Sequence, residues 1–103
     1  MTTPEACQTM ADVRAGVDAL DRELVALLAR RFAYMRSAAR IKPERGMVRD
    51  EARKAAVIAA ARTEAQALGA PAERIAALWE ALVESSIAYE LEQWDAKESK
   101  IAR

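Results

Sequence analysis

The stretch ADVRAGVDALDRELVALLARR, residues 11–31, repeats apolar residues at the spacing of one helix face. They follow each other at steps of three or four positions, which is typical of an amphipathic helix: Val13, Val17, Leu20, Leu24 and Leu27. Few of the intervening residues are apolar and large, and no proline interrupts the run. The stretch therefore predicts a long helix with a single apolar stripe.

The flanking residues predict where this helix begins and ends. Thr9 and Asp12 have the spacing of a capping box, and Lys42-Pro43 stops the helix because the residue before a proline is kept out of helical geometry. A helix from about Met10 to Ile41 spans roughly 46 Å. A compact chain of this length has a radius of gyration of only about 13 Å. The helix would leave its stripe exposed unless a second copy covered it, so we expect a homodimer.

Two further helices are predicted after a loop at 43–49. Asp50 is a suitable N-cap for the second, which runs to Leu68. Gly69 suits the position just past a helix end, and Pro71 suits the first turn of the next helix. The third helix reaches about Lys97, and the final ESKIAR is expected to fray. The sequence thus predicts an all-α, single-domain protomer of three helices over residues 1–103.

Composition excludes several classes of function. Sixteen acidic residues balance sixteen basic ones, so the chain has no net positive charge that would attract nucleic acid or an anionic membrane surface. Histidine is absent and there is one cysteine, Cys7, which leaves neither the commonest general base nor a metal site. No apolar run reaches membrane-spanning length, and no leader pattern is present. We expect a cytoplasmic protein without cofactor or metal.

Three polar residues fall where the helical stripes call for apolar side chains. Arg31 continues the stripe of the first helix, and Ser86 and Glu90 continue that of the third. Each has an ordinary explanation: an arginine that extends its head into water, a serine bonded to its own backbone, and a glutamate in an interhelical ion pair. Together with cations nearby they instead predict a polar pocket for a small dicarboxylate, lined by Arg31, Lys42, Arg53, Ser86 and Glu90. Arg14 is about four and a half turns from Arg31, so an antiparallel second copy would have to supply it.

The run at 11–31, followed by Lys42, VRDEAR at 48–53 and ESSIAYE at 84–90, resembles the all-helical chorismate mutases over roughly residues 4–94. The N-terminal TPEAC, the opening ADVR and the short loop after Lys42 resemble the isochorismate-pyruvate lyase branch of the same fold. The resemblance implies an intertwined homodimer with two identical active sites, which converts chorismate to prephenate without a cofactor.

The resemblance also implies roles for individual residues. Arg14 would cross from the second copy, and Arg31 and Arg53 would bind the substrate carboxylates. Lys42 would lie beside the ether oxygen of the breaking bond. Two polar residues would line the pocket, Asp50 and Ser86.

Two positions depart from the pattern of the mutases. Lys54 replaces a glutamate that contacts the ring hydroxyl, and Glu90 replaces a glutamine that faces the ether oxygen. A carboxylate accepts hydrogen bonds but donates none, so Glu90 must carry a proton to assist. We therefore expect activity to rise on the acidic side of neutrality.

In the stretch VRDEARK, residues 48–54, we expect the polar residues to differ in role. Asp50 starts a helix, Arg53 turns inward to the anion, and Arg49 and Lys54 are solvated. Two alternatives to the mutase stay open: an isochorismate-pyruvate lyase that uses the same pocket, and a non-catalytic dimeric helical module in which the cations form interhelical salt bridges.

Overall fold

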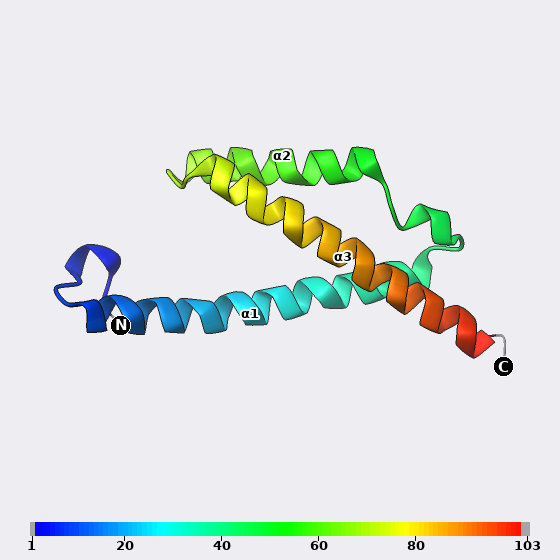
Figure 1. Ribbon diagram of the computed structural model, residues 1–103, viewed down its shortest axis with the longest axis horizontal. Coiled ribbons are helices and arrows are strands. Elements are labelled where there is room, and N and C mark those ends of the chain that lie inside the picture. Colours follow the sequence, from blue (N-terminus) through cyan, green and yellow to red (C-terminus); the bar gives the residue numbers. More distant parts are fainter. Residues whose placement is uncertain (1, 102–103) are drawn as a thin grey trace. The chain divides into compact units, whose positions relative to one another are not determined.

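The computed structural model describes residues 2–101, and every regular element in that part is helical. The predicted all-α class is therefore confirmed, as are three long helices. The elements in chain order are η1 (Pro4–Ala6), α1 (Met10–Ile41), η2 (Arg45–Met47), α2 (Glu51–Ala67) and α3 (Ala72–Ile101) (Figure 1). The chain divides into two units, and the boundary falls inside α1, between Ala33 and Tyr34. One domain over residues 1–103 stays an expectation.

In the N-terminal unit, a capping box starts α1. The Asp12 backbone N–H donates to Thr9 Oγ1 at 3.1 Å, and the Asp12 carboxylate accepts from the backbone N–H groups of Gln8 at 3.1 Å and Thr9 at 3.3 Å. These bonds, led by that from Gln8, lower the pKa of Asp12 below its ordinary value. The predicted start of the helix is confirmed, because Thr9 and Asp12 satisfy each other's backbone groups.

The apolar stripe of α1 lies largely exposed. The five residues of the predicted stripe keep between 39% and 55% of their surface accessible: Val13, Val17, Leu20, Leu24 and Leu27. Leucines and valines at consecutive helical turns are the kind of contiguous apolar surface that a monomer rarely leaves in water. That a second copy covers this stripe, as the length of the helix led us to expect, stays a prediction.

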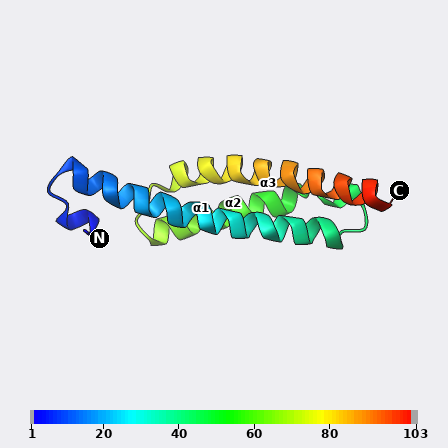
Figure 2. The same cartoon turned by 90° about the horizontal axis from the view of Figure 1, so that it is seen from below.

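In the C-terminal unit, α2 and α3 run side by side in opposite directions (Figures 1 and 2). Asp50 caps α2, and Gly69 adopts a φ of 71°, which allows the tight turn into α3. Both features confirm the sequence-based expectation. The boundaries differ by one residue, since Leu68 follows the end of α2 and Pro71 precedes the start of α3.

A small apolar core holds this unit together. Val48, Val83 and Ile87 are buried, and five partly buried side chains pack against them: Val57, Ile58, Trp79, Leu91 and Trp94. Val48 comes from the loop rather than from a helix, so the core fixes the segment between α1 and α2 against α3. Within this loop, residues 45–47 form η2, a turn that the sequence did not predict.

The predicted end of α3 at Lys97 is wrong, because the helix continues to Ile101. No glycine or proline follows Lys97, so nothing in the covalent structure stops the helix there. Residues 102 and 103 of the segment expected to fray lie outside the described residues. No helix within residues 2–101 is both long and apolar enough to cross a membrane.

Candidate active site

The centre of the candidate site is an ion pair between α3 and the residue that follows α1. Lys42 Nζ donates to Glu90 Oε2 at 2.7 Å. The Glu90 side chain is 5% exposed and that of Lys42 is 30% exposed. A buried carboxylate requires a partner of opposite charge, because desolvation of an unpaired ion is costly. Two of the residues that the sequence assigned to catalysis thus lie in direct contact.

The backbone of Lys42 is held as firmly as its side chain. Its carbonyl oxygen accepts hydrogen bonds from Trp94 Nε1 at 3.1 Å and from Lys97 Nζ at 3.0 Å. Lys97 also donates to the carbonyl oxygen of Ala39 at 3.0 Å, and its ammonium lies 5.0 Å from the centre of the Trp94 ring. Two carbonyls at the end of α1, that of Ala39 and that of Lys42 just after the helix, are therefore satisfied by α3. This fixes the place where Lys42 leaves the helix.

Ser86 lies one helical turn before Glu90 and is 3% exposed. Its hydroxyl donates to the backbone carbonyl of Leu82 at 2.7 Å. This is the ordinary bond of a serine inside a helix, which the sequence offered as one of two readings. A role for Ser86 in lining a pocket stays a prediction.

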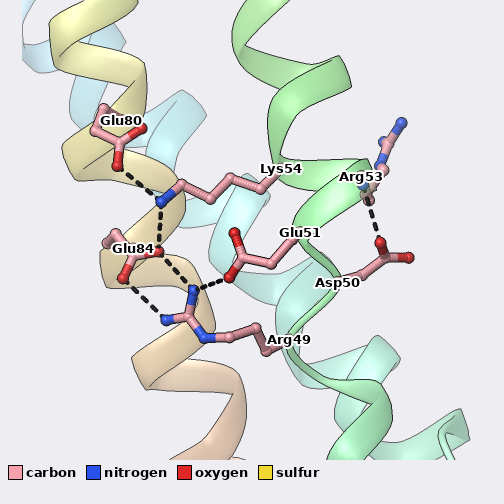
Figure 3. A network of polar contacts seen from close by, with 7 residues as sticks. All are labelled: Arg49, Asp50, Glu51, Arg53, Lys54, Glu80 and Glu84. Atoms are coloured by element: carbon pink, nitrogen blue, oxygen red, sulfur yellow. Dashed lines mark hydrogen bonds and ion pairs between the residues drawn. The ribbon is translucent and has the colours of Figure 1, made fainter.

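Asp50 caps α2, and Arg53 lies in its first turn. The Asp50 carboxylate accepts the Arg53 backbone N–H at 3.0 Å, so Asp50 acts as the predicted N-cap. Arg53 is exposed. Figure 3 shows its side chain on the other side of α2 from Arg49 and Lys54. Its carboxylate-binding role stays a prediction, as does the role of Asp50 beyond the cap.

Arg49 and Lys54, which flank this turn, both bind Glu84 of α3 (Figure 3). Arg49 donates to the two oxygens of Glu84 at 2.9 and 3.1 Å, and Lys54 Nζ lies 3.0 Å from Glu84 Oε2. Lys54 also pairs with Glu80 at 2.7 Å, and Arg49 with Glu51 at 2.8 Å. The expectation that Arg49 and Lys54 are simply solvated is therefore wrong. Sequence spacing could not pair them with Glu84, more than 25 positions away.

Ion pairing shifts the pKa values of three residues of this network. Hydrogen bonds from Arg49 and then Lys54 lower the pKa of Glu84 to about 2. Glu84 in turn raises the pKa of Arg49, and Glu80 followed by Glu84 raises that of Lys54. Glu84, Arg49 and Lys54 therefore keep their charges near neutral pH, which keeps the first turn of α2 paired with α3.

Arg14 and Arg31 belong to the N-terminal unit. Arg14 is exposed and Arg31 is half-buried on α1. Their roles in binding substrate stay predictions, as does the crossing of Arg14 from a second copy.

Sequence reasoning missed three polar residues that support the site: Glu84, Trp94 and Lys97. Glu84 begins the quoted run ESSIAYE, yet nothing in its spacing distinguishes it from a solvated glutamate. Trp94 and Lys97 act on backbone carbonyls, and contacts of that kind leave no side-chain pattern in a sequence. Only the approach of α3 to the end of α1 could reveal them.

Three long helices and a lysine paired with a buried glutamate define an all-helical protein with a polar centre that contains no histidine and no cysteine. The chorismate mutase type II family matches residues 13–91, and the chain belongs to this family. The chain is also similar to the isochorismate pyruvate lyase of Pseudomonas aeruginosa. The two are 30% identical over 94 residues, which covers 91% of this chain and 93% of the relative.

Proposed function

We propose that the protein is a chorismate mutase, which rearranges chorismate to prephenate. The observation that supports this most is the position of Lys42. This cation directly follows α1, and its ammonium lies 2.7 Å from the buried carboxylate of Glu90 on α3. The [3,3] rearrangement is unimolecular and requires no nucleophile or general base. It is accelerated by groups that hold the dianion in its reactive chair and stabilise charge on the ether oxygen.

In this mechanism Lys42 donates to the ether oxygen as the bond breaks. Glu90 holds Lys42 in place before substrate arrives, and in its protonated form it donates a second hydrogen bond to the same oxygen. Arg31 and Arg53 bind the two carboxylates through their guanidinium groups, whose geometry matches a carboxylate bidentately. Rearrangement then breaks the ether C–O bond and forms the new C–C bond within one molecule.

The functional unit in this proposal is a homodimer. The exposed stripe of α1 supplies the apolar surface for a second copy, whose Arg14 reaches the site of the first. Dimerisation would bury the remaining surface of five large apolar side chains. Because about half of each is already covered, each would contribute only part of the roughly 1.5–3 kcal/mol of complete burial. A site shared between copies is complete only in the dimer.

The second candidate is an isochorismate-pyruvate lyase, which gives salicylate and pyruvate. Two observations favour it: the similarity to the lyase of Pseudomonas aeruginosa over nearly the whole chain, and the position of Lys54. Lys54 replaces the glutamate that the resemblance expects at the ring hydroxyl, and it pairs with Glu80 and Glu84. The same Lys42 and arginines would serve this pericyclic elimination.

Separate incubations with chorismate and with isochorismate test the proposal. Prephenate is followed in the first by its conversion to phenylpyruvate in acid, and salicylate in the second by fluorescence. A kcat/KM for chorismate that exceeds that for isochorismate supports the mutase. The reverse order assigns the lyase, and no turnover of either substrate contradicts both and favours a non-catalytic module.

A further inference from the structure

A groove on the C-terminal unit gathers positive charge without any carboxylate. It has a volume of about 410 Å³ and lies between the last turns of α1 and the last turns of α3. Four of its seven lining residues are basic: Arg36, Arg40, Lys97 and Lys100. None of the lining residues is acidic, although the chain as a whole has a net charge of zero. Four like charges in one groove repel each other, which favours binding of an anion.

Much of this charge is available to a ligand. The side chains of Arg40 and Lys100 make no ion pair or hydrogen bond with other described residues (2–101), and both residues are exposed. Arg36 uses one guanidinium nitrogen to donate to the Tyr89 hydroxyl at 3.0 Å, which leaves further donors. Lys97 uses two of its three N–H groups on the carbonyls of Ala39 and Lys42. Lys97 therefore already has partners in the carbonyls at the end of α1, whereas the other three cations have donors left for a ligand.

We propose that this groove is a second anion site, separate from the Lys42–Glu90 centre, for a small molecule with two or more phosphate or carboxylate groups. The size of the groove falls in the range of small-molecule sites, about 300–1,000 Å³. Four cations match a multiply charged ligand better than a single carboxylate. Gln93 adds an amide that can both donate to and accept from such a ligand.

An anion in this groove is coupled to Lys42 through Lys97. The Lys97 ammonium contacts the groove, the Trp94 ring and the carbonyl of Lys42, so a ligand that attracts it changes the hydrogen bonding at the end of α1. We expect the KM of the enzyme to change when the groove is filled. This consequence rests on the proposed function, whereas the binding itself does not.

Trp94 provides a direct reporter of binding. Its indole N–H donates to the Lys42 carbonyl beside Lys97, so its ¹H–¹⁵N resonance is expected to move when an anion fills the groove. Pyrophosphate and citrate are titrated in parallel at constant ionic strength, so that a preference between phosphate and carboxylate groups can be measured. The Trp79→Phe variant assigns the resonance, because the chain has two tryptophans.

Three variants locate the site. The double variant Arg40→Gln/Lys100→Gln is expected to weaken binding by about ten- to hundredfold. Arg22→Gln/Arg74→Gln removes the same charge from exposed positions outside the groove and should bind as the wild type does. Arg53→Gln removes a predicted substrate contact and should also leave the titration unchanged.

Saturable movement of the Trp94 resonance that only the groove variant loses would support the proposal. No movement at millimolar pyrophosphate or citrate, equal weakening in the matched control, or loss in Arg53→Gln would overturn it. Binding with an unchanged KM would retain the site and contradict the coupling to Lys42. An enzyme without turnover would leave the binding result intact.

Discussion

At the scale of single residues, the buried Glu90 carboxylate depends on Lys42 for its counter-charge, and Glu90 in turn holds the Lys42 ammonium in place. Glu90 is buried, so removal of Lys42 leaves a carboxylate without a partner. Lys42 is more exposed, and its ammonium has three donors, so it can donate to Glu90 and to a ligand at once. Lys42 can therefore stay paired with Glu90 and still donate a hydrogen bond to the substrate.

Replacement of Lys42 by alanine tests the catalytic role. We expect kcat/KM to fall about 100- to 1,000-fold, since loss of one donor to the developing charge costs roughly 2.7–4 kcal/mol. Arg31→Ala is expected to be at least as damaging, because it loses a bidentate carboxylate contact. The double variant Arg31→Ala/Lys42→Ala should stay helical by circular dichroism and dimeric by sedimentation. Unfolding or dissociation would instead indicate that these cations form structural salt bridges between helices.

Replacement of Glu90 by glutamine tests the donor role of that residue. A glutamine oxygen still accepts from Lys42 while its amide donates to the ether oxygen, whereas an ionised carboxylate only accepts. We expect Glu90→Gln to retain or exceed the wild-type kcat at neutral pH, and Glu90→Ala, which can neither donate nor accept, to lower it. A Glu90→Gln variant as slow as Glu90→Ala would refute this role.

At the scale of elements, ion pairs from residues before and after the N-cap of α2 hold the start of this helix against α3. Arg49 and Lys54 bind the same carboxylate, Glu84, on either side of the cap at Asp50 (Figure 3). Val48 is buried against Val83, so an apolar contact reinforces the polar ones. This turn carries Arg53, and its position relative to α3 sets where that guanidinium can reach.

Glu84→Gln should therefore weaken substrate binding without loss of the fold. We expect KM to rise roughly two- to fivefold, a modest change because the pairs are partly exposed, with kcat little altered. Glu73→Gln is the matched control, because Glu73 pairs with Arg62 at 2.9 Å and also joins α2 to α3, but at the other end. If Glu84 acts only through Arg53, the variant adds nothing in an Arg53→Ala background. Equal effects of both glutamine variants would contradict a positioning role.

The same carboxylate makes the unit sensitive to acid. Its pKa is lowered from 4.5 to about 2, so its stabilising contribution is complete above pH 4.5 and is lost as pH falls through about 2. The wild type should lose helicity in this window when followed by circular dichroism. Glu84→Gln should be less stable near neutral pH and lose less further stability between pH 4.5 and 2. A parallel acid transition in both proteins would refute the assignment.

At the scale of the whole molecule, the exposed α1 stripe and the separation of Arg14 from Arg31 both favour a shared site. In such a dimer, a chain with Arg14→Ala and a chain with Arg53→Ala would each be inactive alone. A mixed dimer contains one site with both arginines intact. Equal mixing after refolding should restore about a quarter of wild-type turnover, because half of the dimers are mixed and each has one working site. No recovery, with mixed dimers present, would mean that Arg14 acts within its own chain.

The sequence by itself determined the helical class, the length of α1, its capping box and the cap at Asp50. Each of these depends on residues only a few positions apart, and local spacing controls helix geometry. It also singled out Glu90, since a polar residue at an apolar position stands out in a periodic pattern, whereas Lys42 was selected as a nearby cation and through the family resemblance.

Only the tertiary structure decided which charges meet. The Lys42–Glu90 pair, the binding of Arg49 and Lys54 to Glu84, and the bonds of Trp94 and Lys97 to the end of α1 all join distant positions. The continuation of α3 beyond Lys97 brings Lys100 to the groove beside Arg40. Such pairings depend on how the helices pack, and surface charges obey no spacing rule that a single sequence reveals.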